Sequence, residues 1–102
     1  MALDQAKIKQ LRAIGHKLKP VVTISGKGLT DGVVAELERA LNDHELIKVK
    51  LAFEEREDKQ EAITQLVKTT RAELVQQVGK IALIYRLARE TNKKLSNLHR
   101  VF

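Results

Sequence analysis

The chain has 102 residues and no cysteine, and its 19 lysines and arginines against 13 aspartates and glutamates give a formal net charge of +6. This length predicts one domain with a core but without a second substrate-binding lobe. The lack of cysteine excludes thiol catalysis and disulfide bonds, and it fits the reducing cytoplasm, where we expect the protein to act. No apolar run has membrane-spanning length and the first residues show no signal-peptide pattern, so we expect no membrane partner.

Charge is unevenly distributed along the chain. Residues 1–30 contain six basic residues and one acidic residue, and residues 80–102 contain the same numbers. Residues 31–58 contain nine acidic and four basic residues. If the two ends of the chain lie near one another, the molecule has a basic face suited to a polyanionic partner and an acidic face. The ordinary alternative is a soluble surface of mixed charge.

The first predicted element is an amphipathic helix over residues 4–17, with Asp4 as its expected N-cap and Pro20 as its stop. Its apolar positions recur at helical spacing and are Ile8, Leu11, Gly15 and Leu18. A neighbouring basic stripe at the same spacing is formed by Lys9, Arg12, His16 and Lys19. This stripe is either a solvated helix face or part of a surface that binds a polyanion.

A short apolar strand over residues 21–25 leads into a glycine-lysine turn, and its nearly unbroken apolar character predicts burial on both faces. A second helix follows, with Thr30 as its expected cap. Glycines allow positive φ and close approach of a ligand to the amides, and a helix N-terminus favours anions. The turn is therefore a candidate phosphate-binding loop, although Lys27 also fits an ordinary solvated turn; its residues are Ser25, Gly26, Lys27 and Gly28.

This turn does not match the common nucleotide-binding motifs. A Walker loop requires Ser or Thr directly after the lysine, whereas Gly28 follows Lys27. The dinucleotide fingerprint requires a third glycine at the position of Asp31. The GxxG loop of KH modules holds a nucleic-acid backbone by similar chemistry, but it lies between two helices. We therefore expect no cofactor.

The remaining elements are a second helix from about Thr30, a strand over 46–52, a helix over 58–70 and a hairpin. The strand alternates, with Ile47, Val49 and Leu51 on one face and Lys48 and Lys50 on the other. The apolar helix positions are Val33, Val34, Leu37, Ala40, Leu41, Ala62, Ile63, Leu66 and Val67. The hairpin joins strands 74–78 and 81–85 through Gly79 and Lys80.

The order helix, strand, helix, strand, helix, strand, strand predicts an α/β (α+β) domain with a four-stranded mixed sheet and helices packed on it. The first two strands should be parallel, with a right-handed crossover, and the last two antiparallel. Residues 87–102 have no clear period and indicate a basic C-terminal tail, which leaves 1–86 as the domain.

Several separated blocks resemble the stand-alone bacterial YhbY family, the single-domain form of the chloroplast RNA splicing and ribosome maturation (CRM) domain. They agree in order and spacing over most of residues 5–86 and comprise residues 18–22, 26–30, 32–37, 44–50, 79–80 and 83–86. The resemblance implies a fold similar to the C-terminal domain of translation initiation factor three. It also implies an RNA-binding protein associated with maturation of the large (50S) ribosomal subunit, with rRNA and subunit precursors as partners, no DNA partner expected and a monomer favoured.

The family loop is usually GxxG, and its first glycine falls on Ser25 here while its second falls on Gly28. Serine resists positive φ, unlike the glycine whose place it takes. Aromatic residues are scarce, so we expect recognition of backbone and shape rather than base stacking. The candidate RNA-binding residues are Lys9, Arg12, His16, Lys19, Ser25, Gly26, Lys27, Gly28, Lys80 and Arg86.

Other chemistry has little support in the sequence. The three histidines are widely separated, so we expect no metal site, and the acidic run around residues 54–58 indicates an exposed turn. No nucleophile and base are paired, so we expect no enzyme. Two alternatives stay open: a small nucleotide-binding enzyme or sensor that uses the glycine-lysine turn, and a protein-interaction module that uses the acidic face.

Overall fold

The structure is a computed structural model that describes residues 4–26 and 28–87, so the expected tail lies outside the described residues except for Leu87. Its elements are α1 (Gln5–Gly15), β1 (Pro20–Ile24), α2 (Asp31–His44), β2 (Leu46–Leu51), α3 (Arg56–Thr70), β3 (Glu73–Val78) and β4 (Ile81–Tyr85). This order confirms the predicted one, although α1 ends at Gly15 rather than at residue 17, and α3 starts at Arg56 rather than at residue 58.

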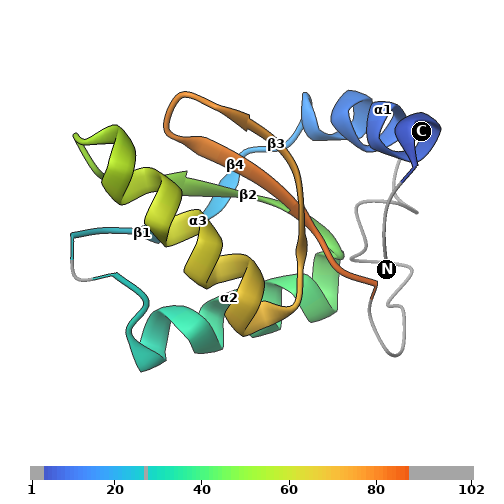
Figure 1. The fold of residues 1–102 in the computed structure, drawn as a ribbon. Helices are drawn as coiled ribbons and strands as arrows, with labels where there is room; N and C mark the ends of the chain where they lie inside the picture. The colour runs from blue at the N-terminus through green and yellow to red at the C-terminus, as the bar shows by residue number, and fades with distance from the viewer. Residues whose placement is uncertain (1–3, 27, 88–102) are drawn as a thin grey trace.

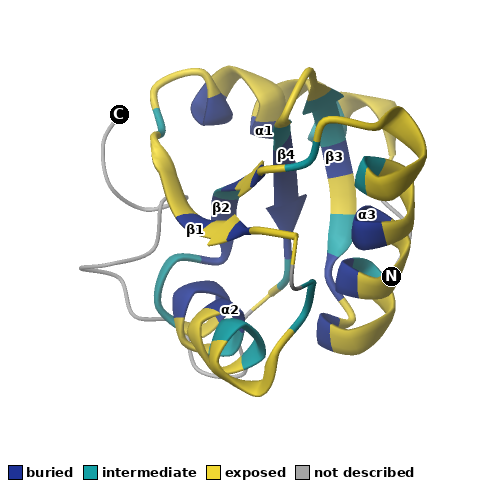
Figure 2. Cartoon of the chain, turned by 90° about the vertical axis from the view of Figure 1, so that its left-hand side faces the viewer, coloured by how far each residue is buried: buried dark blue, intermediate teal, exposed yellow. Residues whose placement is uncertain are grey.

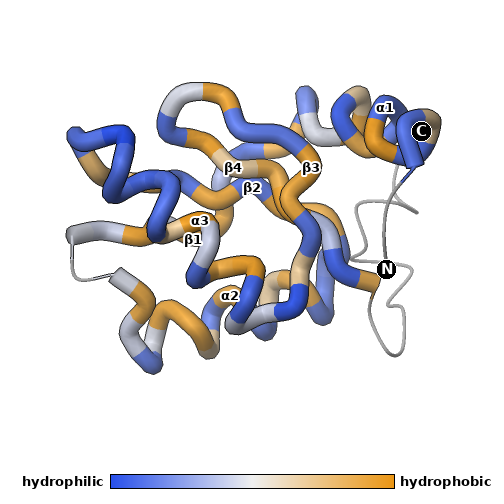
Figure 3. The backbone as a smooth tube through the Cα atoms, in the orientation of Figure 1, coloured by the Kyte–Doolittle hydropathy of each residue, from blue (hydrophilic) through white to orange (hydrophobic). Residues whose placement is uncertain are grey.

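The four strands form one sheet in the order β1-β2-β4-β3 (Figure 1). β1 and β2 are parallel and are joined through α2, whereas β4 is antiparallel to both β2 and β3. The mixed sheet is therefore confirmed. β2 and β4 occupy its centre, and most of their residues are hydrophobic (Figure 3).

Helices cover the two faces of the sheet unequally. α2 and α3 pack on one face, where they turn their buried residues toward the strands (Figure 2) and share a large apolar core that includes Leu37, Leu66 and Ile84. Of the helices that the structure describes, α1 alone packs on the other face, over a smaller cluster that includes Leu11, Leu83 and Tyr85. Figure 1 shows α1 at one end of the molecule, so the second face of the sheet is covered only in part.

Gly15 brings the end of α1 onto the sheet. A Cβ at this position would lie 2.5 Å from Cδ2 of Leu83, a distance that real side chains do not tolerate. The missing side chain thus lets the helix backbone rest on β4. The chain turns away directly afterwards, where the Leu18 N–H donates to the Gly15 carbonyl at 3.0 Å.

The prediction that the first strand is buried on both faces is wrong. β1 is an edge strand with an irregularity between Pro20 and Val22, and Val21 is 52% exposed. Only Val22 and Ile24 are buried. An apolar run indicates a hydrophobic strand, but the number of strands and helices that pack against the strand decides how much of its surface is buried.

The predicted N-caps of the first two helices are confirmed. Asp4 Oδ1 accepts the Lys7 N–H at 2.7 Å, and Thr30 Oγ1 accepts the Val33 N–H at 3.3 Å. These side chains satisfy amides that the helices leave unpaired. Within the described residues, no helix combines the length and the apolar composition needed to cross a membrane.

Candidate nucleic-acid interface

The glycine-lysine turn connects β1 to α2 and is closed by backbone hydrogen bonds. The Gly28 N–H donates to the Ser25 carbonyl at 2.8 Å, and the Thr30 N–H donates to the Gly28 carbonyl at 3.1 Å. Gly28 has φ +74°, which favours glycine, whereas Ser25 is not among the residues with positive φ. Serine at the first position therefore causes no backbone strain. Lys27 lies outside the described residues.

The surroundings of the turn are acidic on the side of α3. Gly26 and Gly28 border a shallow hollow of about 340 Å³ that is also lined by Phe53, Asp58, Glu61, Ala62 and Gln65. The two carboxylates oppose a phosphate entering from that side. At the start of α2, Thr30 already caps one amide and Asp31 places a negative charge in the first turn. These charges disfavour the approach of a phosphate from the side of α3.

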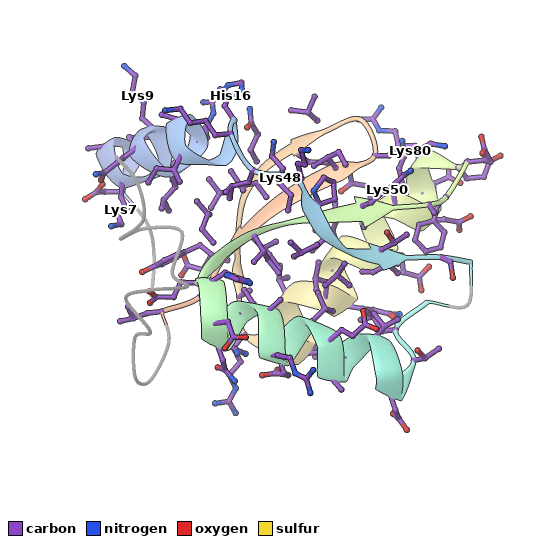
Figure 4. All side chains as sticks on the ribbon, turned by 180° about the vertical axis from the view of Figure 1, so that it is seen from behind. Lys7, Lys9, His16, Lys48, Lys50 and Lys80 are labelled. Atoms are coloured by element: carbon purple, nitrogen blue, oxygen red, sulfur yellow. The ribbon has the colours of Figure 1, made fainter. Side chains whose placement is uncertain are left out.

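All four residues of the predicted helical stripe are exposed, but only Lys9 and Arg12 lie on α1. His16 is the C-cap of the helix, and Lys19 lies beyond it, directly before β1, because α1 ends earlier than predicted. Figure 4 shows Lys9 and His16 on the α1 side of the molecule, whereas the end of β1 and the start of α2, which flank the turn, lie on the opposite side. The structure thus does not bring the two predicted RNA-binding features together.

Two lysines that were not among the candidates extend the stripe across the sheet. Lys48 and Lys50 lie on β2, where they pair with Leu83 and Ile81 of β4. Both lysines belong to the sheet face that α1 leaves open, because Leu83 packs in the cluster beneath α1. Their alternation with buried residues was visible in the sequence. The missing information was that, among the described residues, no helix covers this part of the face.

A hollow of about 230 Å³ lies where α1 ends and the open sheet begins. Strands β2, β3 and β4 form its floor, and the end of α1 forms one wall. No acidic residue lines it, and its lining consists of Gly15, His16, Lys48, Gln76, Val78, Ile81 and Leu83.

Lys80 lies in the β3–β4 turn, next to Gly79 with φ +57°. Its carbonyl accepts the Leu51 N–H at 2.6 Å, which ties the turn to the end of β2. Its ammonium lies 3.4 Å from a carboxylate oxygen of Glu54, and the two side chains are 45% and 91% exposed. Such exposed pairs are weak, so the charge of Lys80 stays available to a partner.

Arg86 has a structural position. Its Nη1 donates to Glu38 Oε2 at 2.7 Å and to the Thr70 carbonyl at 2.8 Å, and its Nη2 donates to Asn42 Oδ1 at 2.9 Å. Its side chain is only 17% exposed. The guanidinium therefore joins the end of β4 to α2 and to the end of α3, on the side of the sheet away from the lysines of β2. This geometry favours a role in stability over direct contact with RNA.

Tyr85 belongs to the packing of α1 rather than to an exposed aromatic surface. Its ring is 5% exposed and lies 6.0 Å from the ammonium of Lys7. Burial raises the pKa of its phenol, and the neighbouring carboxylates of Glu45 and Glu73 raise it further. The ring is thus unavailable for stacking on a base.

These observations define one surface, which we term the open basic face. It combines the exposed side of α1, the part of the sheet that α1 does not cover and the β3–β4 turn, and its residues labelled in Figure 4 lie along one side of the molecule. The basic residues of this face are Lys9, Arg12, His16, Lys48, Lys50 and Lys80. Across the chain from 4 to 26 and from 28 to 87, no three metal-ligating side chains gather at one place.

Comparison with known proteins places this architecture in a family. The family model of the CRS1/YhbY (CRM) domain matches residues 3–86. A Pseudomonas aeruginosa protein named as a probable RNA-binding protein is 56% identical over 100 residues, which cover 98% of this chain and 96% of that protein. A Haemophilus influenzae RNA-binding protein is 49% identical over 85 residues, covering 83% of this chain and 86% of the relative.

A solved structure has the same fold. The solution structure of a hypothetical protein from Staphylococcus aureus, described as a candidate RNA-binding protein, matches with a TM-score of 0.76 and 32% identity. The match covers 92% of this chain and 97% of the other. The names of these relatives refer to RNA binding. The chain belongs to the CRS1/YhbY (CRM) domain family.

Proposed function

We propose that this protein binds structured rRNA through its open basic face and assists maturation of the large ribosomal subunit in the cytoplasm. The observation that supports RNA binding best is that Lys48 and Lys50 lie on a part of the sheet that none of the described helices covers. Neither Lys48 nor Lys50 has an ion-pair partner among the described residues, so both charges are available to phosphates.

The first test measures binding to a precursor rRNA fragment by mobility shift at several salt concentrations. The double variant Lys48→Ala with Lys50→Ala should bind more weakly. Its plot of log affinity against log salt should be less steep by about 1.4–1.8, since each lost phosphate contact removes roughly 0.7–0.9 from the slope. The matched control replaces Arg39 and Lys68, which are exposed on α2 and α3, with alanine. Equal effects of the two double variants would show that only net charge matters and would contradict the assigned face.

The second test concerns the ribosomal role, for which the support is the family relationship. In gradient sedimentation of cell extracts, the protein should move with large-subunit precursors at low salt and return to the top of the gradient as salt rises. A protein that stays at the top at every salt concentration would overturn the ribosomal part of the proposal. RNA binding itself would still be tested by the mobility shift.

The glycine-lysine turn contributes a second, weaker contact in this proposal. Its amides and Lys27 can hold one phosphate from the side away from α3, while Asp58 and Glu61 disfavour a free nucleotide in the adjacent hollow. The alternative of a nucleotide-binding enzyme or sensor loses support for that reason. Micromolar binding of ATP or GTP without RNA would restore it.

A further inference from the structure

The hollow at the end of α1 has a composition that phosphate binding does not explain. Its floor is aliphatic, formed by Val78, Ile81 and Leu83, and Val78 is 63% exposed. Phosphates need cations and amides, so the exposed Val78 and the half-buried Ile81, which lie beside the buried Leu83 in the middle of a basic face, serve some other contact. His16 and Lys48 line the same hollow, and Lys50 is the β2 residue that pairs with Ile81.

We propose that this hollow receives one unpaired base of the bound RNA, a statement that rests on the proposed function and adds a preference for RNA with unpaired nucleotides. Flat apolar surface of the base packs on the aliphatic floor, and the flanking phosphates lie against Lys48 and Lys50. The volume of about 230 Å³ is below the roughly 300–1,000 Å³ of pockets that enclose whole ligands, which suits a single base.

Gln76 supplies the polar group that such a site requires. Its side chain lines the hollow, and it has no hydrogen-bond partner among the residues the structure describes. An amide both donates and accepts hydrogen bonds, so it can pair with the edge of a base. The neighbouring Gln77, by contrast, points to the other side of the sheet, where its Oε1 accepts a hydrogen bond from Gln60 Nε2 at 2.9 Å.

An unpaired base fits better than a continuous duplex. In a duplex the base faces are stacked on one another, so an aliphatic floor gains nothing from contact with them. In a bulge or loop the base can leave the stack and be buried, while its own phosphates stay at the rim. The cationic rim around an apolar centre matches this division between phosphate and base.

The test compares two fluorescent RNAs with equal numbers of phosphates, a continuous duplex and a duplex with a three-nucleotide bulge. The protein should bind the bulged RNA more tightly. The double variant Val78→Thr with Ile81→Thr keeps the net charge and the branching at Cβ but removes apolar surface. It should bind the bulged RNA about five- to tenfold more weakly. Affinity for the duplex should not change.

The matched control is Leu74→Thr, which makes a comparable change at a residue of β3 that is 41% exposed but outside the hollow. A photoreactive thiouridine in the bulge gives an independent readout that needs no variant. After trypsin digestion it should be attached to residues 72–80 or 81–86, the two peptides that carry the floor.

The outcomes separate the two proposals. If the protein binds neither RNA, the proposed function fails. If it binds both RNAs equally, or if the crosslink falls outside those two peptides, the base site is overturned while RNA binding stands. Equal losses for the control and the threonine variant would also overturn the base site.

Discussion

Gly26 and Gly28 have different backbone requirements although only Lys27 separates them. Gly28 has φ +74°, whereas Gly26 has no positive φ, and a Cβ at either position has no atom of the described residues within 4 Å, apart from its chain neighbours. Gly28→Ala should therefore lower the free energy of unfolding by about 1–2 kcal/mol through backbone strain.

Gly26→Ala is the matched control and should change the free energy of unfolding by less than about 0.5 kcal/mol. Urea denaturation of both variants measures the difference. If the two variants have the same stability, the left-handed conformation of Gly28 is not required. Loss of RNA affinity in the folded Gly26→Ala protein would indicate that RNA approaches the turn closely, because the added methyl group touches none of the described residues apart from its chain neighbours.

Tyr85 is the single tyrosine of the chain, so its ionisation can be followed by ultraviolet absorbance without ambiguity. Its pKa should lie above the ordinary 10.0, because burial and the carboxylates of Glu45 and Glu73 disfavour the phenolate. In urea the midpoint should return to about 10. A midpoint at or below 10 in the folded protein would contradict the buried position of the ring.

The raised pKa of Tyr85 also makes the stability of the fold depend on pH in a known direction. Because the folded state holds the phenolic proton more tightly than the unfolded state, this contribution is complete below pH 10 and is lost as the pH rises through the raised pKa of Tyr85. Tyr85→Phe removes the titrating group. Its stability should therefore decline less steeply above pH 10 than that of the parent protein.

At the scale of elements, contact between α1 and β4 determines where the sheet stays uncovered. Gly15→Ala forces Leu83 to move, since the new Cβ would lie 2.5 Å from its Cδ2, and the variant should lose about 1–3 kcal/mol of stability. In Gly32→Ala the new Cβ lies 4.0 Å from Thr30 Oγ1, an ordinary contact, and this variant should gain about 0.4–1 kcal/mol.

Both substitutions replace a helical glycine with alanine, so they share the same gain in helix propensity. The difference between them in thermal denaturation isolates the packing of α1 on the sheet. A stabilised Gly15→Ala protein would mean that α1 does not pack against Leu83. The end of α1 would then not line the hollow beside Gly15.

At the scale of the whole molecule, the segments that flank the glycine-lysine turn lie on the opposite side from α1, as Figures 1 and 4 show. If one RNA spans both, the losses in binding free energy from Lys27→Ala and from the pair Arg12→Glu with Lys19→Glu should add within about 0.3–0.5 kcal/mol, because the sites share no partners. Mobility shifts of the single and combined variants measure this sum. No effect of Lys27→Ala would leave the turn as a simple connection.

The sequence by itself determined the elements of this fold. Asp4 and Thr30 cap their helices as expected, Gly79 and Lys80 form the turn between β3 and β4, and Lys48 alternates with buried neighbours. These features depend on residues close together in the chain, so capping, turn chemistry and periodicity are sufficient to predict them. The blocks that resemble the CRM domain likewise identified the family from the sequence.

Tertiary structure alone decided which surfaces are available. It placed β1 at an edge, which exposes Val21, and it gave the guanidinium of Arg86 partners on α2 and α3. It also left Lys48 and Lys50 on a face that α1 covers only in part. These outcomes depend on which distant segments pack together, and local patterns carry no information about strand order or helix coverage. The candidate RNA surface therefore could be defined only after the chain was folded.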